Sequence, residues 1–126
     1  MKFKTLMILK ALVCLSLGAP ILIAPVFLYS LFGADLNPAG VFAAREYGAS
    51  LIGNLCVTWF ARNAVDSDAR RAIILGLCIY DAIGFVITLI AQIAGVLGPL
   101  GWFAMAIYLF FAIGFGYFLL PQKKAI

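Results

Sequence analysis

Six polar or charged side chains interrupt the apolar parts of this chain, and they are the residues best able to do chemistry there. They are Arg45, Glu46, Asn54, Asp81, Thr88 and Gln92. Ionisable groups in apolar surroundings can carry protons or ions, and amide and hydroxyl groups can position a ligand or hold helices together. These six residues therefore form the candidate site.

Asp81 is the central member of this set. It follows Arg71 by about ten residues, which places it about 15 Å along a helix. A lone ionised carboxylate at such a depth in a membrane costs at least about 2.5–3.5 kcal/mol, so it must be protonated, paired or hydrated. Asn54 lies within about 3 Å of the same depth when counted from Arg62. We therefore expect a hydrogen bond between Asn54 and Asp81.

The remaining candidates flank Asp81 in depth or share its helix face. At about 100° per residue, Asp81 shares one face with Cys78, Gly84, Phe85, Thr88 and Gln92, and the opposite face carries Ile79, Tyr80, Ile83, Val86, Ile87 and Ile90. The sequence therefore predicts that the first face points into the protein and the second into lipid.

Two neighbouring charges, Arg45 and Glu46, lie nearer the outer surface. The long side chain of Arg45 can extend outward toward Asp35 or inward toward Asp81. Glu46 points about 100° away from Arg45 on a helix, so the two are not forced to pair. Glu46 is a candidate second carboxylate on a path leading from Asp81.

Four apolar segments must position these side chains, at residues 11–32, 38–61, 72–95 and 99–120. Each is long enough to cross a hydrocarbon core about 30 Å thick, which needs about 20 helical residues. Hydrophobic residues make up 66% of the 126, against about 45–50% in soluble domains. The sequence predicts an all-α single domain over residues 1–126, an integral membrane up-down four-helix bundle with antiparallel neighbours.

Local signals mark the helix ends. Asn37 followed by Pro38 is typical of an N-cap and a first helical residue, and Ser67, between two aspartates, predicts the start of the third segment. Pro20 and Pro25 interrupt the first segment, which favours a kinked packing helix over a broken helix that lines an ion site. Close helix contacts are predicted by small residues four apart: Ala44/Gly48, Ala49/Gly53, Ala91/Gly95 and Ala112/Gly116.

The distribution of basic residues predicts the orientation. They gather before the first segment, between the second and third, and after the fourth: Lys2, Lys4, Lys10, Arg62, Arg70, Arg71, Lys123 and Lys124. By the positive-inside rule both termini face the cytoplasm. The net charge of +4 is thus explained by helix ends and does not indicate nucleic acid. The expected partners are the lipid bilayer and either further copies of the chain or other membrane subunits.

The sequence gives little support for catalysis or for metal binding. The chain has no histidine, which excludes histidine-ligated metals and Ser-His-Asp triads. Its three cysteines, Cys14, Cys56 and Cys78, form no C-x-x-C pair, and no glycine-rich phosphate loop is present. We predict no catalytic residue, no metal and no cofactor, and the sequence favours a protein that is not an enzyme.

The layout resembles small four-helix membrane proteins of bacteria, loosely those of the DoxX-like group. The resemblance is carried by a proline-bearing first helix that ends in Leu31-Phe32-Gly33, the short loop with Asn37-Pro38, the run Ala44-Arg45-Glu46-Tyr47-Gly48, and the last apolar helix. It implies a multi-pass protein of the bacterial inner membrane and carries no activity with it.

Three functions fit these observations. The favoured one is a non-catalytic component, either an accessory subunit of a membrane complex or a small homo-oligomer, in which the polar groups hold helices together. The alternative is a proton-coupled transporter or channel that uses Asp81. The third is a membrane protein that binds a lipid or another hydrophobic substrate.

Overall fold

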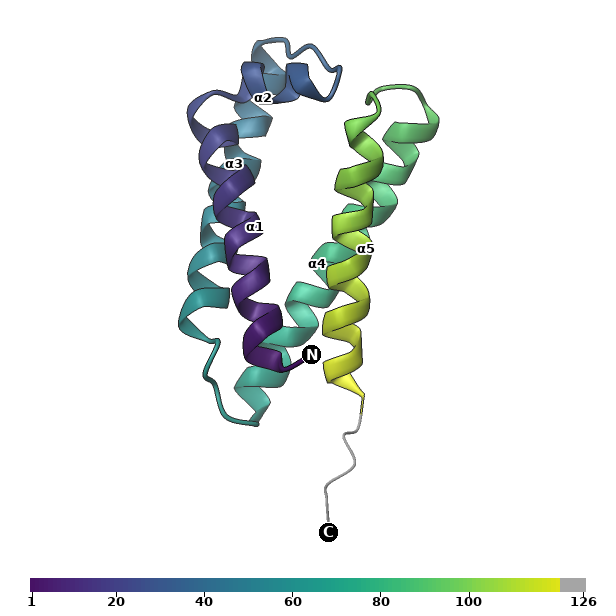
Figure 1. Ribbon diagram of the computed structural model, residues 1–126. Helices are drawn as coiled ribbons and strands as arrows, with labels where there is room; N and C mark the ends of the chain where they lie inside the picture. The colour runs from purple at the N-terminus through teal and green to yellow at the C-terminus, as the bar shows by residue number, and fades with distance from the viewer. Residues whose placement is uncertain (121–126) are drawn as a thin grey trace.

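A computed structural model describes residues 1–120, and all the regular structure in that range is helical (Figure 1). The elements are α1 (Phe3–Ile23), α2 (Pro25–Leu31), α3 (Pro38–Phe60), α4 (Asp68–Ile93) and α5 (Leu100–Leu119). Lys123 and Lys124 lie outside the described residues. The all-α prediction is confirmed, and the last three long helices begin and end within four residues of the predicted segments.

The predicted first segment, residues 11–32, is wrong at both ends. Its helix begins at Phe3 and ends at Ile23, and the short helix α2 follows after a single non-helical residue, Ala24. The break occurs there because a residue that precedes a proline is pushed out of the helical conformation, and Pro25 follows Ala24. Pro20 stays inside α1, so the interruption lies at the end of this helix and not midway along it.

The predicted helix starts of α3 and α4 are confirmed. The Asn37 side chain accepts a hydrogen bond of 2.7 Å from the backbone nitrogen of Gly40, and Pro38 opens α3. The Ser67 hydroxyl accepts one of 3.2 Å from the backbone nitrogen of Arg70 at the start of α4. Both caps satisfy backbone donors that a helix leaves unpaired in its first turn.

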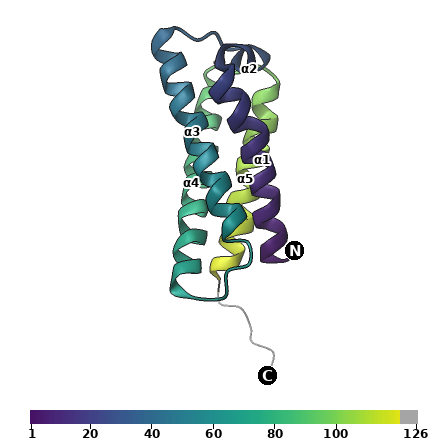
Figure 2. The same cartoon turned by 90° about the vertical axis from the view of Figure 1, so that its left-hand side faces the viewer.

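The four long helices pack as two antiparallel pairs, α1 with α3 and α4 with α5 (Figures 1 and 2). Glycines let α1 and α3 approach closely, because a Cβ atom on Gly48 would lie only 2.9 Å from the backbone nitrogen of Leu22. The predicted pair Ala44/Gly48 is thus at a helix contact. Gly53, of the pair Ala49/Gly53, faces outward: apart from the adjoining backbone of α3, no heavy atom of residues 1–120 lies within 4 Å of its Cβ position.

The two pairs join at the end of the molecule that carries the N-terminus (Figure 1). A buried apolar cluster fills this end and takes side chains from α1, α4 and α5: Phe3, Leu6, Met7, Ile74, Leu77, Phe111 and Phe115. At the other end α2 lies across the α1–α3 pair (Figures 1 and 2), and the backbone nitrogen of Gly98 donates a 2.6 Å hydrogen bond to the carbonyl of Phe32. The helix pairs are therefore tied together at both ends.

Three helices of the described chain, α1, α4 and α5, are long and apolar enough to cross a membrane. α3 has 23 residues but does not reach the same hydropathy, since it carries Arg45, Glu46 and Asn54. The apolar helices make a membrane protein the natural assignment for the chain.

Candidate functional site

Asp81 forms an ion pair with Lys10, which belongs to α1. The ammonium group of Lys10 donates to Asp81 Oδ1, and both residues are buried: Lys10 exposes 2% of its surface and Asp81 none. The prediction that Lys10 is a basic anchor preceding the first helix is wrong, because α1 begins at Phe3 and Lys10 lies two turns inside it. Of the three states allowed for Asp81, the structure shows the paired one.

The sequence contains a pattern that indicates the burial of Lys10. Phe3, Met7, Lys10 and Cys14 follow one another at steps of four, three and four residues, which places them on one face of a helix. All four are buried in the structure. Extending the first helix toward the N-terminus would have placed this lysine among core residues.

The surroundings of the ion pair are aromatic and apolar. The ammonium nitrogen of Lys10 lies 4.9 Å from the ring centroid of Phe111 and 5.2 Å from that of Tyr80, within the range of cation–π attraction. The second carboxylate oxygen of Asp81, Oδ2, is buried and has no hydrogen-bond partner in residues 1–120. A buried pair with one unsatisfied oxygen is costly to maintain, which makes it a marker for function as much as for stability.

The expected hydrogen bond between Asn54 and Asp81 is not formed. The side-chain nitrogen of Asn54 is buried and has no hydrogen-bond partner within residues 1–120, and the backbone carbonyl of Asn54 accepts a 2.8 Å hydrogen bond from Thr58 Oγ1. The prediction failed because α3 packs along α1 and not along α4. Equal depth in the membrane therefore did not bring the two side chains together.

Arg45 and Glu46 are both exposed on the outer surface of α3. Neither contact expected for Arg45, with Asp35 or with Asp81, is present, and the pair of Lys10 and Asp81 is the one salt bridge within residues 1–120. The structure thus separates these two charges from the buried part of the candidate site.

Thr88 and Gln92 satisfy backbone groups of their own helix and its loop. Thr88 Oγ1 donates a 2.7 Å hydrogen bond to the carbonyl of Gly84, and Gln92 Nε2 donates one of 3.2 Å to the carbonyl of Gly98. Both side chains are half-buried, as the predicted inward face of α4 requires. These hydrogen bonds hold both side chains in place, and Thr88 also lines the cavity described below.

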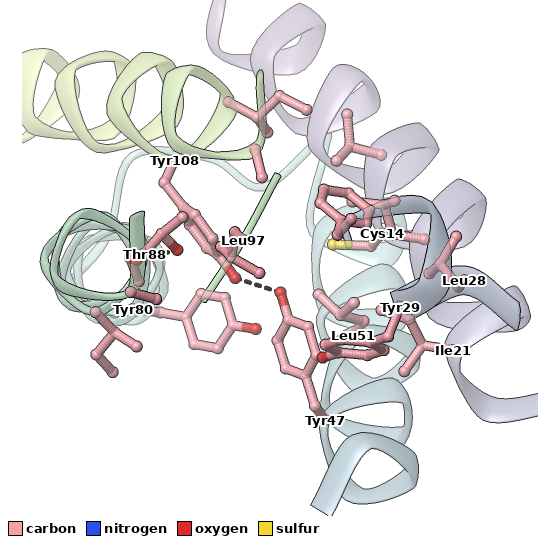
Figure 3. Close-up of a pocket in the computed structure, with 18 of the residues that line it drawn as sticks. Cys14, Ile21, Leu28, Tyr29, Tyr47, Leu51, Tyr80, Thr88, Leu97 and Tyr108 are labelled. Atoms are coloured by element: carbon pink, nitrogen blue, oxygen red, sulfur yellow. Dashed lines mark hydrogen bonds between the residues drawn. The ribbon is translucent and has the colours of Figure 1, made fainter. Parts of the chain in front are cut away.

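Tyrosines form a second polar group that the sequence analysis missed. Tyr29, Tyr47, Tyr80 and Tyr108 come from four different helices and line the same cavity (Figure 3). The hydroxyls of Tyr47 and Tyr108 are hydrogen-bonded to each other and so connect α3 with α5. Tyr80, predicted to face lipid, turns its hydroxyl toward this pair in Figure 3. That hydroxyl is buried and has no partner in the described residues.

The tyrosines line a cavity of about 500 Å³ between the two helix pairs. Its remaining lining is mostly aliphatic, and Lys10 is the one charged residue of the described chain that reaches it. Ile83 and Ile87 line the cavity although 54% and 61% of their surface is exposed, so the cavity opens to the outside along α4. Ligand pockets in proteins have volumes of about 300–1,000 Å³, and this cavity falls within that range.

Gly84 makes room for one of the cavity tyrosines. A Cβ atom at this position would lie 2.3 Å from a ring carbon of Tyr108, so the ring rests directly against the backbone of α4. The placement of the Tyr108 hydroxyl thus depends on glycine at this position.

The three cysteines are free and differ in exposure. Cys14 is buried, Cys78 is half-buried and Cys56 is exposed. In residues 1–120 no group of three acidic, cysteine or histidine side chains is arranged to hold a metal ion.

Comparison with known proteins identifies no relative of this chain. No family model, no curated protein and no solved structure matches the chain. The resemblance to the DoxX-like group stays a prediction, and function must be argued from the site itself.

Proposed function

We propose that this protein crosses the bacterial inner membrane and binds a lipophilic small molecule in the cavity between its two helix pairs. This is the third of the functions considered from the sequence. The observation that carries it is the cavity itself, whose lining is mostly aliphatic and aromatic with a few polar groups. That combination is typical of small-molecule sites, in which apolar walls give affinity and a few polar groups give orientation.

The exposed residues on the cavity rim support a ligand that arrives from the membrane. Ile83 and Ile87 belong to α4, one of the helices apolar enough to cross a bilayer. In a membrane, their exposed surfaces contact acyl chains, and an opening at that place admits molecules dissolved in lipid. A soluble substrate would need a polar entrance, and the lining offers few polar groups.

The proposed orientation follows from the basic residues. The N-terminus, the loop between α3 and α4, and the end of α5 lie at one end of the molecule (Figure 1). Lys2, Lys4, Arg62, Arg70 and Arg71 lie at or next to these segments. By the positive-inside rule this end faces the cytoplasm, and four long helices then cross the bilayer with α3 as the least apolar of them.

The test is to purify the protein in mild detergent and to identify the small molecules that it retains by extraction and mass spectrometry. Ala104 lines the cavity, so Ala104→Phe is expected to fill it. Ala106→Phe, on the same helix but exposed and outside the cavity lining, is the matched control. Wild type and Ala106→Phe should retain the same lipophilic molecule and Ala104→Phe should lose most of it. Equal retention by both variants, or no retained molecule in wild type, contradicts the proposal.

A proton-coupled transporter is the second candidate, and the buried ion pair favours it. Lys10 lines the cavity while its partner Asp81 is fully buried, so a ligand in the cavity and a charge on Asp81 can affect each other through Lys10. Asp81→Asn in liposomes with an imposed pH gradient tests this function. Loss of ligand-dependent proton movement with retained ligand binding supports transport, and unchanged proton movement contradicts it.

The role as an accessory subunit or homo-oligomer is compatible with a bound lipophile. Native mass spectrometry of the same gently extracted preparation tests it. Co-purifying proteins support a subunit of a larger complex, and defined multiples of the chain mass support a homo-oligomer. A monomer without partners contradicts both.

A further inference from the structure

The polar groups of the cavity carry more hydrogen-bond donors than the protein itself uses. A lysine ammonium group has three donors, and one of those of Lys10 is used by Asp81 Oδ1. The Tyr80 hydroxyl makes no hydrogen bond in the described part of the chain. Of the two hydroxyls in the Tyr47–Tyr108 hydrogen bond, one donates and the other keeps its own proton. A ligand that satisfies these groups must bring an acceptor.

The charge balance of the cavity argues that this acceptor is neutral. Lys10 is already neutralised by Asp81, and no other charged side chain of residues 1–120 lines the cavity. A carboxylate or phosphate head group would add a negative charge that has no buried counter-ion, and burying an unpaired charge is costly. A carbonyl oxygen accepts hydrogen bonds without bringing a charge.

The positions of the donors fit a ligand that has a single polar group on an otherwise apolar molecule. Tyr80 directly precedes Asp81 on α4, and the ammonium nitrogen of Lys10 lies 5.2 Å from the Tyr80 ring centroid. The Tyr80, Tyr47 and Tyr108 hydroxyls lie near one another in the cavity (Figure 3), and the aliphatic lining extends on both sides of them. Three tyrosine hydroxyls are therefore gathered at one place, and the ammonium group of Lys10 lies beside the ring of one of these tyrosines, Tyr80.

Building on the proposed lipophile-binding function, we infer that the ligand is a neutral lipophile with a carbonyl group, such as a long-chain ketone, a quinone or an ester, and that its carbonyl oxygen accepts hydrogen bonds from Tyr80 and Lys10. Tyr80 is the specificity residue chosen for the test, because its buried hydroxyl makes no hydrogen bond within 3.5 Å in residues 1–120.

The test compares three probes of equal chain length: 2-tridecanone, tridecane and tridecanoic acid. Their dissociation constants are measured from the rise in unfolding temperature of the purified protein in dodecyl maltoside. Wild type should bind the ketone about 5- to 100-fold more tightly than the alkane, the factor expected for two net hydrogen bonds, one from Tyr80 and one from Lys10. Tyr80→Phe should reduce this preference about 3- to 10-fold, since the bond from Lys10 remains, and leave alkane binding within about twofold. Tyr117→Phe, outside this cavity, should keep the preference.

The outcomes separate this inference from the function on which it rests. Equal binding of ketone and alkane by wild type, tightest binding of the acid, or an unchanged preference in Tyr80→Phe overturns the inference. Ala104→Phe should weaken all three probes alike. If it weakens none, the cavity is not the site, and the proposed function falls together with the inference.

Discussion

Removing one charge of the Lys10–Asp81 pair is expected to destabilise the protein strongly, whereas removing both is not. Lys10 exposes 2% of its surface and Asp81 none, and within residues 1–120 neither has another salt-bridge partner. Breaking a buried pair by removing one partner costs about 3–5 kcal/mol, because an uncompensated charge stays behind. At about 1.4 kcal/mol per factor of ten, the ratio of folded to unfolded protein falls roughly 100- to 4,000-fold.

The assay is reversible unfolding in mixed micelles of dodecyl maltoside and SDS, applied to Lys10→Met, Asp81→Asn and the double variant. Both substitutions keep the approximate size of the side chain. The double variant should recover at least half of the larger single loss, which for single losses of about 3–5 kcal/mol corresponds to a coupling free energy of at least about 4.5 kcal/mol. Lys4→Met is the control, because Lys4 is exposed on the same helix, and it should stay within about 0.5 kcal/mol of wild type.

Two results would refute this reasoning. Single variants that each stay within about 1 kcal/mol of wild type would mean that the pair is not buried as the structure shows. Losses that simply add in the double variant would mean that the two side chains do not interact.

Further predictions concern glycine and capping positions. Gly84→Ala should cost about 1–3 kcal/mol and displace the Tyr108 ring, since the added Cβ would lie 2.3 Å from it. At Gly76, on the same helix, no heavy atom of the described chain beyond the adjoining helix backbone lies within 4 Å of the Cβ position, so Gly76→Ala should leave stability unchanged or raise it by less than about 1 kcal/mol. Equal losses in the two variants of the same unfolding assay would contradict the close packing. Asn37→Ala should cost about 1 kcal/mol through the lost cap of α3. Circular dichroism and the unfolding assay check it, and a neutral Asn37→Ala would argue against the cap.

Local features of the fold were predictable because they depend on neighbours in sequence. Asn37 and Ser67 begin helices through hydrogen bonds that span three residues. The inward face of α4 follows from a periodicity that one helix already contains, and Asp81 is indeed fully buried. The error at α1 was also local in origin: the lysine at position 10 suggested a helix end, whereas the apolar spacing around it continues to Phe3.

The candidate site was predictable only in part. Asp81 was identified because a deep carboxylate is costly, but Tyr80 was assigned to lipid from its place on the helical wheel. The structure brings Tyr80 to the cavity because the helix pairs diverge between their two joined ends, so residues beside the packed face of α4 also line the cavity. Helical periodicity assumes that each helix has one packed face, and a cavity violates that assumption.

The sequence by itself determined the helical class, the apolar character, the helix starts at Asn37 and Ser67, and the burial of Asp81, since each follows from composition or from spacing within one helix. Only the tertiary structure decided that Asp81 pairs with Lys10 and that four tyrosines share a cavity. Those contacts depend on which helices pack together, and that choice depends on long-range fits such as the close approach of Gly48 to the α1 backbone. Depth and helix face limit the partners of a side chain, but the packing of whole helices selects among them.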